Sequence, residues 1–197
     1  MTPIVTAQTD LFGVADALPQ GLSFEADFIG TQEECALLDI AAALPLQSAR
    51  YQQYTARRRV HAWGAGFDFG QGRLRHAAIG ELPPPLHRLR EQLAAWVGVA
   101  ADDFVHVMVS EYQRGTPLGW HRDAPAYELI TGVSLGNMAT LRFRPYPPQA
   151  AQRENTIALQ LAPRSAYAMR GVARWGWQHS VPPVSGLRYS VTMRTAR

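Results

Sequence analysis

Two histidines and an aspartate have the types and the spacing to bind a metal ion together. His121 and Asp123 lie two residues apart, and in an extended segment residues with this spacing project to the same side. A His-x-Asp pair alone is common and is equally typical of a surface ion pair or a turn. A third candidate, His179, ends a strand-like segment later in the chain. Together the three side chains would offer two imidazoles and one carboxylate.

This ligand set is typical of non-haem Fe(II) oxygenase sites. There, two histidines and one carboxylate occupy one face of the ion and leave the other coordination positions for a cosubstrate and O2. A structural zinc site is disfavoured because the chain has a single cysteine, Cys35. We therefore predict that His121, Asp123 and His179 bind a catalytic Fe(II) ion.

A second set of polar residues lies on the last predicted strand, residues 186–194. Alternation places four of them on one face of this strand: Arg188, Ser190, Thr192 and Arg194. A solvated outer face would explain this pattern. If the polar face instead lines a barrel interior beside the metal, Arg188 and Ser190 would suit a carboxylate of a bound dicarboxylic acid.

The elements that must position these groups are two helices followed by many short strands. Apolar residues at helical spacing predict helices over 31–44 and 84–98. From residue 104 the apolar period changes to two, which predicts strands at 104–112, 130–135, 139–144, 155–161, 165–170, 173–179 and 186–194. An earlier strand pair is expected at 57–63 and 66–69. This order predicts an α+β domain whose strands form a sandwich or barrel, with helices covering one face.

Length and composition restrict the class of protein. The 197 residues, 47% of them apolar, predict one domain over 21–197 that follows an N-terminal arm over 1–20. Neither a signal peptide nor a membrane-spanning segment is expected, and the single cysteine favours a reducing, cytoplasmic location. All 19 basic residues are arginine and the formal charge is +3, which leaves nucleic-acid binding open. We expect a monomer.

The sequence resembles the Fe(II)/2-oxoglutarate-dependent dioxygenases of the AlkB type. The resemblance extends over nearly the whole chain from about residue 10 and combines several motifs, which are more specific together than any one alone. These are Ser110-Glu111-Tyr112, His121-Arg122-Asp123, the strand pair 132–136 and 141–144, His179, and Arg188 with Arg194.

The resemblance implies a double-stranded β-helix, or jelly roll, with helices packed on one sheet. The three predicted ligands would bind Fe(II), and 2-oxoglutarate and O2 would be cosubstrates. Arg188 and Ser190 would contact the distal carboxylate of 2-oxoglutarate, Arg194 its iron-proximal end, and Tyr112 would add a hydrogen bond. In such enzymes 2-oxoglutarate becomes succinate and CO2 while an alkyl group is oxidised, and an N-methyl group leaves as formaldehyde.

The substrate that the resemblance implies first is an alkylated base in DNA or RNA, as in DNA repair. Residues 57–70 combine arginines, aromatics and glycines where the family has a nucleotide-recognition lid. Arg58 would hold a phosphate there, while Trp63, Phe67 or Phe69 would stack on a base. Solvated arginines and core aromatics would explain the same residues.

Two alternatives remain open. Many nucleic-acid-repairing members carry an acidic residue shortly after the metal aspartate, where this chain has Ala124-Pro125, and Pro125 favours a protein or small-molecule substrate. Ser110 and Ser190 stand where several members have asparagine, so two side chains that would contact the cosubstrate are shorter here. The second alternative is a noncatalytic metal- or nucleic-acid-binding module, which the complete set of ligand candidates and both arginines disfavours.

Overall fold

The computed structural model describes residues 4–5, 18–51, 54–68, 70–75, 77–148 and 156–197. Most of the predicted arm over 1–20 therefore lies outside the described residues, as does Phe69.

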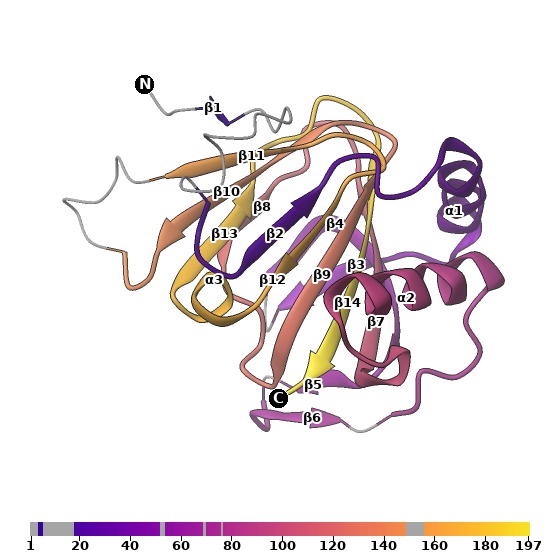
Figure 1. Ribbon diagram of the computed structural model, residues 1–197, viewed down its shortest axis with the longest axis horizontal. Coiled ribbons are helices and arrows are strands. Elements are labelled where there is room, and N and C mark those ends of the chain that lie inside the picture. Colours follow the sequence, from indigo (N-terminus) through magenta and orange to yellow (C-terminus); the bar gives the residue numbers. More distant parts are fainter. Residues whose placement is uncertain (1–3, 6–17, 52–53, 69, 76, 149–155) are drawn as a thin grey trace.

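Two sheets face each other, and helices cover the outer face of the larger one (Figure 1). The larger sheet has the order β2 (Leu22–Glu25), β12 (Ala166–Met169), β9 (Tyr127–Leu135), β14 (Arg188–Ala196), β7 (Phe104–Tyr112), β4 (Tyr54–Gly64) and β3 (Gln47–Tyr51). The smaller sheet has the order β1 (Ile4–Val5), β11 (Ile157–Leu161), β10 (Ala139–Pro145), β13 (Trp177–Val181) and β8 (Leu118–His121). Apart from the β1–β11 pair, the pairings within both sheets are antiparallel.

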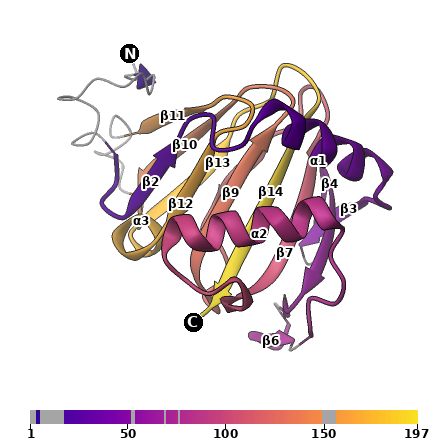
Figure 2. The ribbon, with the colours of Figure 1, turned by 45° about the vertical axis from the view of Figure 1, so that its right-hand side comes forward.

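The helices are short and begin or end where the sequence predicts. They are α1 (Thr31–Ala43), α2 (Pro84–Val97), a 3-10 turn η1 (Ala101–Asp103) and α3 (Gly171–Trp175). A proline stands at the first position of α2, and Gly98 ends this helix with a left-handed φ of 71°. Figure 2 shows α2 lying across the larger sheet, over β9, β14 and β7.

Alternation along the central strands divides their side chains between two apolar layers. On one side, Val109 of β7 and Val191 of β14 pack with Leu89 and Leu93 of α2. The opposite faces of these strands point between the two sheets, where a second cluster around Phe143 and Leu159 forms the inter-sheet core. The predicted jelly roll with helices on one sheet is thereby confirmed, and the polar face of β14 lies inside it.

Two of the predicted strands are wrong in part. Residues 171–175 form α3, so only the end of the predicted strand 173–179 is extended, as β13. From this helix, buried Arg174 reaches the loop after β8, as described below. The segment 66–69 forms β5 (Gly66–Asp68), which pairs with β6 (Arg73–Arg75) rather than with β4.

No helix among the described residues is both long enough and apolar enough to cross a membrane.

Candidate active site

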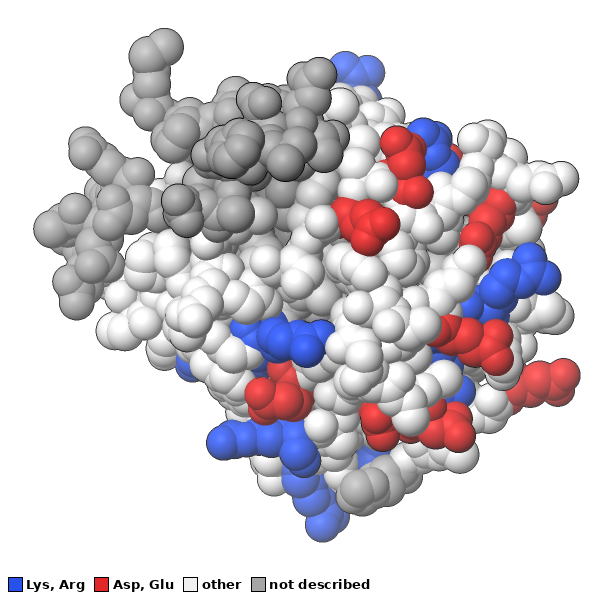
Figure 3. All heavy atoms as spheres, viewed as in Figure 1, with Lys and Arg blue, Asp and Glu red and all other residues white. Residues whose placement is uncertain are grey.

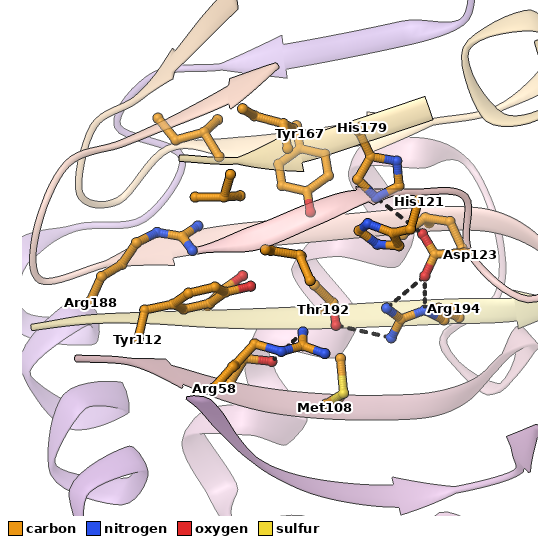
Figure 4. A pocket seen from close by; sticks show the side chains of 17 residues that line it. Arg58, Met108, Tyr112, His121, Asp123, Tyr167, His179, Arg188, Thr192 and Arg194 are labelled. Carbon is orange, nitrogen blue, oxygen red and sulfur yellow. Dashed lines mark hydrogen bonds and ion pairs between the residues drawn. The ribbon is translucent and has the colours of Figure 1, made fainter. Parts of the chain in front are cut away.

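β8 and β13 bring the three predicted metal ligands together. His121 ends β8 and pairs with His179 of β13, which places the ring centroids 4.2 Å apart. Asp123 follows β8 directly, and its Oδ2 lies 3.4 Å from Nε2 of His179. One ligand atom from each of the three residues lies within 4.8 Å of the others (Figure 4). Three donors that converge in this way fit one metal ion with open positions on its far side.

The protonation states of the three groups suit a metal site. Burial, reinforced by the neighbouring His121, lowers the pKa of His179 to about 3, so its imidazole is neutral at pH 7. Burial also lowers the pKa of His121. Burial alone would raise the pKa of Asp123, but the neighbouring charge of Arg194 holds it below its usual range. Neutral imidazoles and an ionised carboxylate are the forms that bind a metal.

Neighbouring groups fix the orientation of the ligands. Nδ1 of His121 lies 2.9 Å from the carbonyl oxygen of Gly119, and a proton shared there leaves Nε2 to the metal. Arg194 donates through Nε to Oδ1 of Asp123 at 2.9 Å, and its Nη2 lies 2.8 Å from the same oxygen. Its Nη1 donates to Thr192 and lies 3.2 Å from Nδ1 of His106. The structure thus places Arg194 at the metal end of β14, where it holds the carboxylate ligand.

Arg188 lies at the other end of the same pocket. It is 2% exposed, and its Nε donates to Oγ of Ser134 at 3.0 Å. Its Nη1 is buried and has no hydrogen-bond partner among the described residues. The Tyr112 ring, from the paired position of β7, lies 5.0 Å from the guanidinium carbon. A buried guanidinium N–H without an acceptor is costly, and a carboxylate is the acceptor that fits its geometry best.

The pocket between these ends has a mixed lining. Its walls include the triad, both arginines and Arg58, together with Met108, Ser110, Tyr112, Tyr167, Ser190 and Thr192. The predicted cosubstrate residues therefore all face one interior space. The donor set fits an Fe(II) ion at one end and a dicarboxylic acid whose far carboxylate reaches Arg188.

Arg174 is a site residue that sequence reasoning missed. From α3, its 3%-exposed side chain donates to the carbonyl oxygens of Asp123 (3.2 Å), Ala124 (2.7 Å) and Tyr127 (2.9 Å). Its guanidinium carbon lies 4.2 Å from the Trp175 ring centroid. Arg174 thus clamps the loop that carries the carboxylate ligand. Residues 173–179 were predicted to form a strand, and the alternation of that strand gave no reason to place the Arg174 side chain in the interior.

The predicted substrate residues divide between the two faces of the larger sheet. Arg58 lines the pocket, where its Nη1 donates to Oγ of Ser110 at 3.4 Å. Trp63 pairs with Val107, so it lies on the helix-facing side and packs against that core. This position, across the sheet from the triad, does not favour a base contact by Trp63. Phe67 of β5 is half-buried against the inter-sheet core, and Phe69 lies outside the described residues.

A groove that the sequence did not reveal opens beside the triad. Its volume is about 330 Å³, and it runs between β4 and β8. Its lining consists of Ala56, Arg57, Arg58 and residues 117–121, which include Trp120 and the predicted metal ligand His121. The groove therefore offers a substrate a positively charged and aromatic approach to the metal site.

Comparisons with known proteins agree with this site. The family model described as "2OG-Fe(II) oxygenase superfamily" matches residues 47–196. The chain is 29% identical over 198 residues to the alkylated DNA repair protein ALKBH8 homolog of Arabidopsis thaliana, covering 90% of this chain and 56% of that protein. It is 32% identical over 79 residues to the uncharacterized protein L905 of Acanthamoeba polyphaga mimivirus, covering 39% and 36%. The chain thus spans only about half, or less, of these curated relatives.

Solved structures share the fold. The structure of OsALKBH1 matches with a TM-score of 0.66 at 12% identity, covering 90% of this chain and 99% of that one. A 2OG-Fe(II) oxygenase family oxidoreductase from Burkholderia pseudomallei matches with a TM-score of 0.65 at 15% identity, covering 99% and 96%. With the converging His-Asp-His triad and the family match over three quarters of its length, this chain belongs to the 2OG-Fe(II) oxygenase superfamily.

Proposed function

We propose that this oxygenase is an oxidative dealkylase of alkylated bases in DNA or RNA. The observation that carries the proposal is the groove beside His121, whose lining places Arg57, Arg58 and Trp120 next to the metal site. Guanidinium groups and an aromatic ring are the side chains that hold phosphates and bases. The name of the Arabidopsis relative, an alkylated DNA repair protein homolog, points to the same substrate class.

In this proposal the residues of the chain bind and orient the reactants. His121, Asp123 and His179 hold Fe(II), while Arg188 and Tyr112 hold the far end of 2-oxoglutarate. Ser190 lies between the two ends, and Arg194 keeps Asp123 in place. The iron with 2-oxoglutarate and O2 supplies the oxidising chemistry, and the protein contributes positioning and the exclusion of water. The proposal includes a monomeric, cytoplasmic enzyme, as the sequence predicts.

The test is an assay that measures both products. Anaerobic protein is loaded with Fe(II) and 2-oxoglutarate, mixed with a pool of methylated oligonucleotides, and started with O2. Mass spectrometry then measures succinate and formaldehyde. We expect both products to rise together with at least one methylated base.

Variants at the triad provide the control. His121→Ala and Asp123→Ala should abolish both products while circular dichroism stays unchanged. Succinate without formaldehyde from every oligonucleotide would overturn the nucleic-acid assignment and favour a protein or small-molecule substrate. Full turnover in either variant would contradict the assigned metal ligands.

A further inference from the structure

The outer face of the smaller sheet carries a cluster of arginines and aromatic rings that the catalytic pocket does not use. We call it the arginine–tryptophan face. It consists of Trp120 on β8, Arg142 and Arg144 on β10, and Arg122 with Tyr146 at its edge.

Strand alternation makes Arg142 and Arg144 point away from the interior. Their neighbours Leu141 and Phe143 are buried in the inter-sheet core, so the arginines occupy the opposite side of β10. Each is held through Nε by an outward residue of β13. Arg142 donates to Ser180 at 3.2 Å, and Arg144 donates to Gln178 at 2.8 Å.

The Trp120 ring reaches across β13 to both arginines. Its centroid lies 5.1 Å from the guanidinium carbon of Arg142 and 4.6 Å from that of Arg144. Beside them, the guanidinium carbon of Arg122 lies 3.7 Å from the ring centroid of Tyr146, which is 42% exposed. These stacked arrangements orient the guanidinium groups before any ligand binds.

Among the described residues, the positive charge of this face has no acidic partner. Within the part of the chain that the structure describes, no carboxylate lies within 4.0 Å of Arg122, Arg142 or Arg144. The outward residues beside them on β13, β10 and β11 are uncharged: Thr140, Gln160, Gln178 and Ser180. By contrast, the helix-bearing side in Figure 3 shows acidic and basic side chains next to one another.

Trp120 connects this face with the catalytic site. Its ring contacts Arg142 and Arg144, and the same residue lines the groove that opens at His121. A long polyanion bound on the face would therefore continue into the groove. We infer that the arginine–tryptophan face binds the phosphate backbone of the nucleic-acid strand next to the base that enters the pocket. This inference rests on the proposed function and extends its substrate contacts beyond the predicted lid.

Oriented guanidinium groups favour phosphates over peptide carboxylates as the ligand here. Phosphates recur along a nucleic-acid strand and match a row of arginines that carries no sequence-reading groups. Binding of this kind is electrostatic, so the logarithm of the association constant falls linearly with the logarithm of the salt concentration. The slope is about −0.7 per contacted phosphate for a single strand.

The test measures binding without catalysis. Fluorescence anisotropy follows the binding of an unmethylated 20-nucleotide single-stranded DNA to the full chain over a series of salt concentrations. Arg144→Gln should weaken binding and reduce the slope by about 0.7, and Arg142→Gln with Arg144→Gln should reduce it by about 1.4 and weaken binding about tenfold at low salt. Arg144→Lys, which retains the charge, should keep the slope.

Arg88→Gln is the matched control. Arg88 is exposed on α2, across the sandwich from the face, and its loss changes the net charge equally. This variant should bind like the original protein, and thermal melting of every variant reports any loss of folding. Equal slopes for Arg144→Gln and the original protein, or no DNA binding by the original protein, would overturn the inference. The formaldehyde assay tests the proposed function separately. If the protein releases formaldehyde but Arg144→Gln keeps the salt slope of the original protein, only the role of this face is contradicted.

Discussion

At the scale of single residues, the unpaired N–H of Arg188 is the feature with the clearest functional consequence. Burial lowers the pKa of its guanidinium, which shows that the charge lies in a poorly solvated place. We predict that Arg188→Met raises the KM for 2-oxoglutarate about 100-fold, because a buried charge-assisted contact is lost. The melting temperature of the ligand-free protein should stay the same or rise, because an uncompensated buried charge is removed. Steady-state kinetics and thermal melting measure the two effects.

Exposed Arg88 supplies the control for this prediction as well. Arg88→Met removes a charge from the surface of α2 and should change neither the KM nor the melting temperature. An unchanged KM in Arg188→Met would reject the carboxylate role. A large drop in its melting temperature would show that Arg188 stabilises the fold instead.

His106 makes the stability of the fold depend on pH. Burial, with the adjacent charge of Arg194, lowers the pKa of His106 to about 3, well below its value in an unfolded chain. Between these two values the unfolded state binds the additional proton, so stability is retained above about pH 6.5 and is progressively lost as the pH falls toward the folded value of about 3. The unfolding free energy of the original protein should fall between pH 7 and 4.5. We predict that in His106→Asn this fall is smaller by roughly 2 kcal/mol.

Urea unfolding at a series of pH values measures this effect. His87→Asn, which replaces an exposed imidazole on α2, is the control for the loss of a surface histidine. A profile of His106→Asn that runs parallel to that of the original protein would mean that His106 does not titrate on unfolding.

At the scale of elements, α3 and the loop after β8 act as one unit through Arg174. We predict that Arg174→Met lowers the affinity of the ligand-free protein for Co(II) by about 10- to 100-fold, because the backbone that carries Asp123 is no longer held. Arg174→Lys should recover part of the stability but little of the affinity, since lysine lacks the second donor, Nε, that also bonds to Tyr127 and lacks the planar group that stacks on the Trp175 ring. Co(II) absorption titrations measure the affinity without turnover.

Arg170 distinguishes positioning from general stability. It precedes α3 and donates to the carbonyl oxygen of Val97 at 2.7 Å, away from the metal ligands. Arg170→Met should therefore lower the melting temperature without changing Co(II) affinity. Equal losses of affinity in Arg170→Met and Arg174→Met would assign Arg174 a structural role only.

The elements also show what periodicity can and cannot predict. Alternation along 186–194 correctly placed Arg188 and Ser190 on one face, because side chains on a strand alternate whatever the strand pairs with, but it did not decide whether this face lay inside or outside. Alternation gave no means of telling which side of the sheet Trp63 would occupy, since that depends on its pairing with Val107 of β7. The helix α3 is too short for its period to appear in the sequence, so Arg174 was missed.

At the scale of the whole molecule, the site depends on contacts between distant segments. His121 meets His179 only because β8 and β13 are neighbours in the smaller sheet, and Arg188 lies opposite Tyr112 only because β14 pairs with β7. The residue types and the family resemblance predicted these ligands before any pairing was known. The groove at Trp120 was not predictable in the same way, because it forms between strands that the linear pattern does not connect.

Both ligands should stabilise the whole fold, because they bind only the native state. The increase from 2-oxoglutarate should depend on the metal being bound first. At about 100 times its dissociation constant, one ligand adds about 2.7 kcal/mol. In a domain of this size that corresponds to an increase of about 5–10 °C in melting temperature. We predict such an increase with Fe(II) under anaerobic conditions, and a second increase when 2-oxoglutarate is added.

The two variants of the pocket ends separate these increments. His121→Ala should lose the increment from Fe(II) and with it most of that from 2-oxoglutarate, because the keto acid needs the metal as well as Arg188. Arg188→Met should keep the metal increment and lose the second. Anaerobic thermal melting with and without a chelator measures each increment. A full effect of 2-oxoglutarate in chelator-treated protein would mean that the acid binds without the metal, and the division of the pocket between a metal end and a carboxylate end would then be wrong.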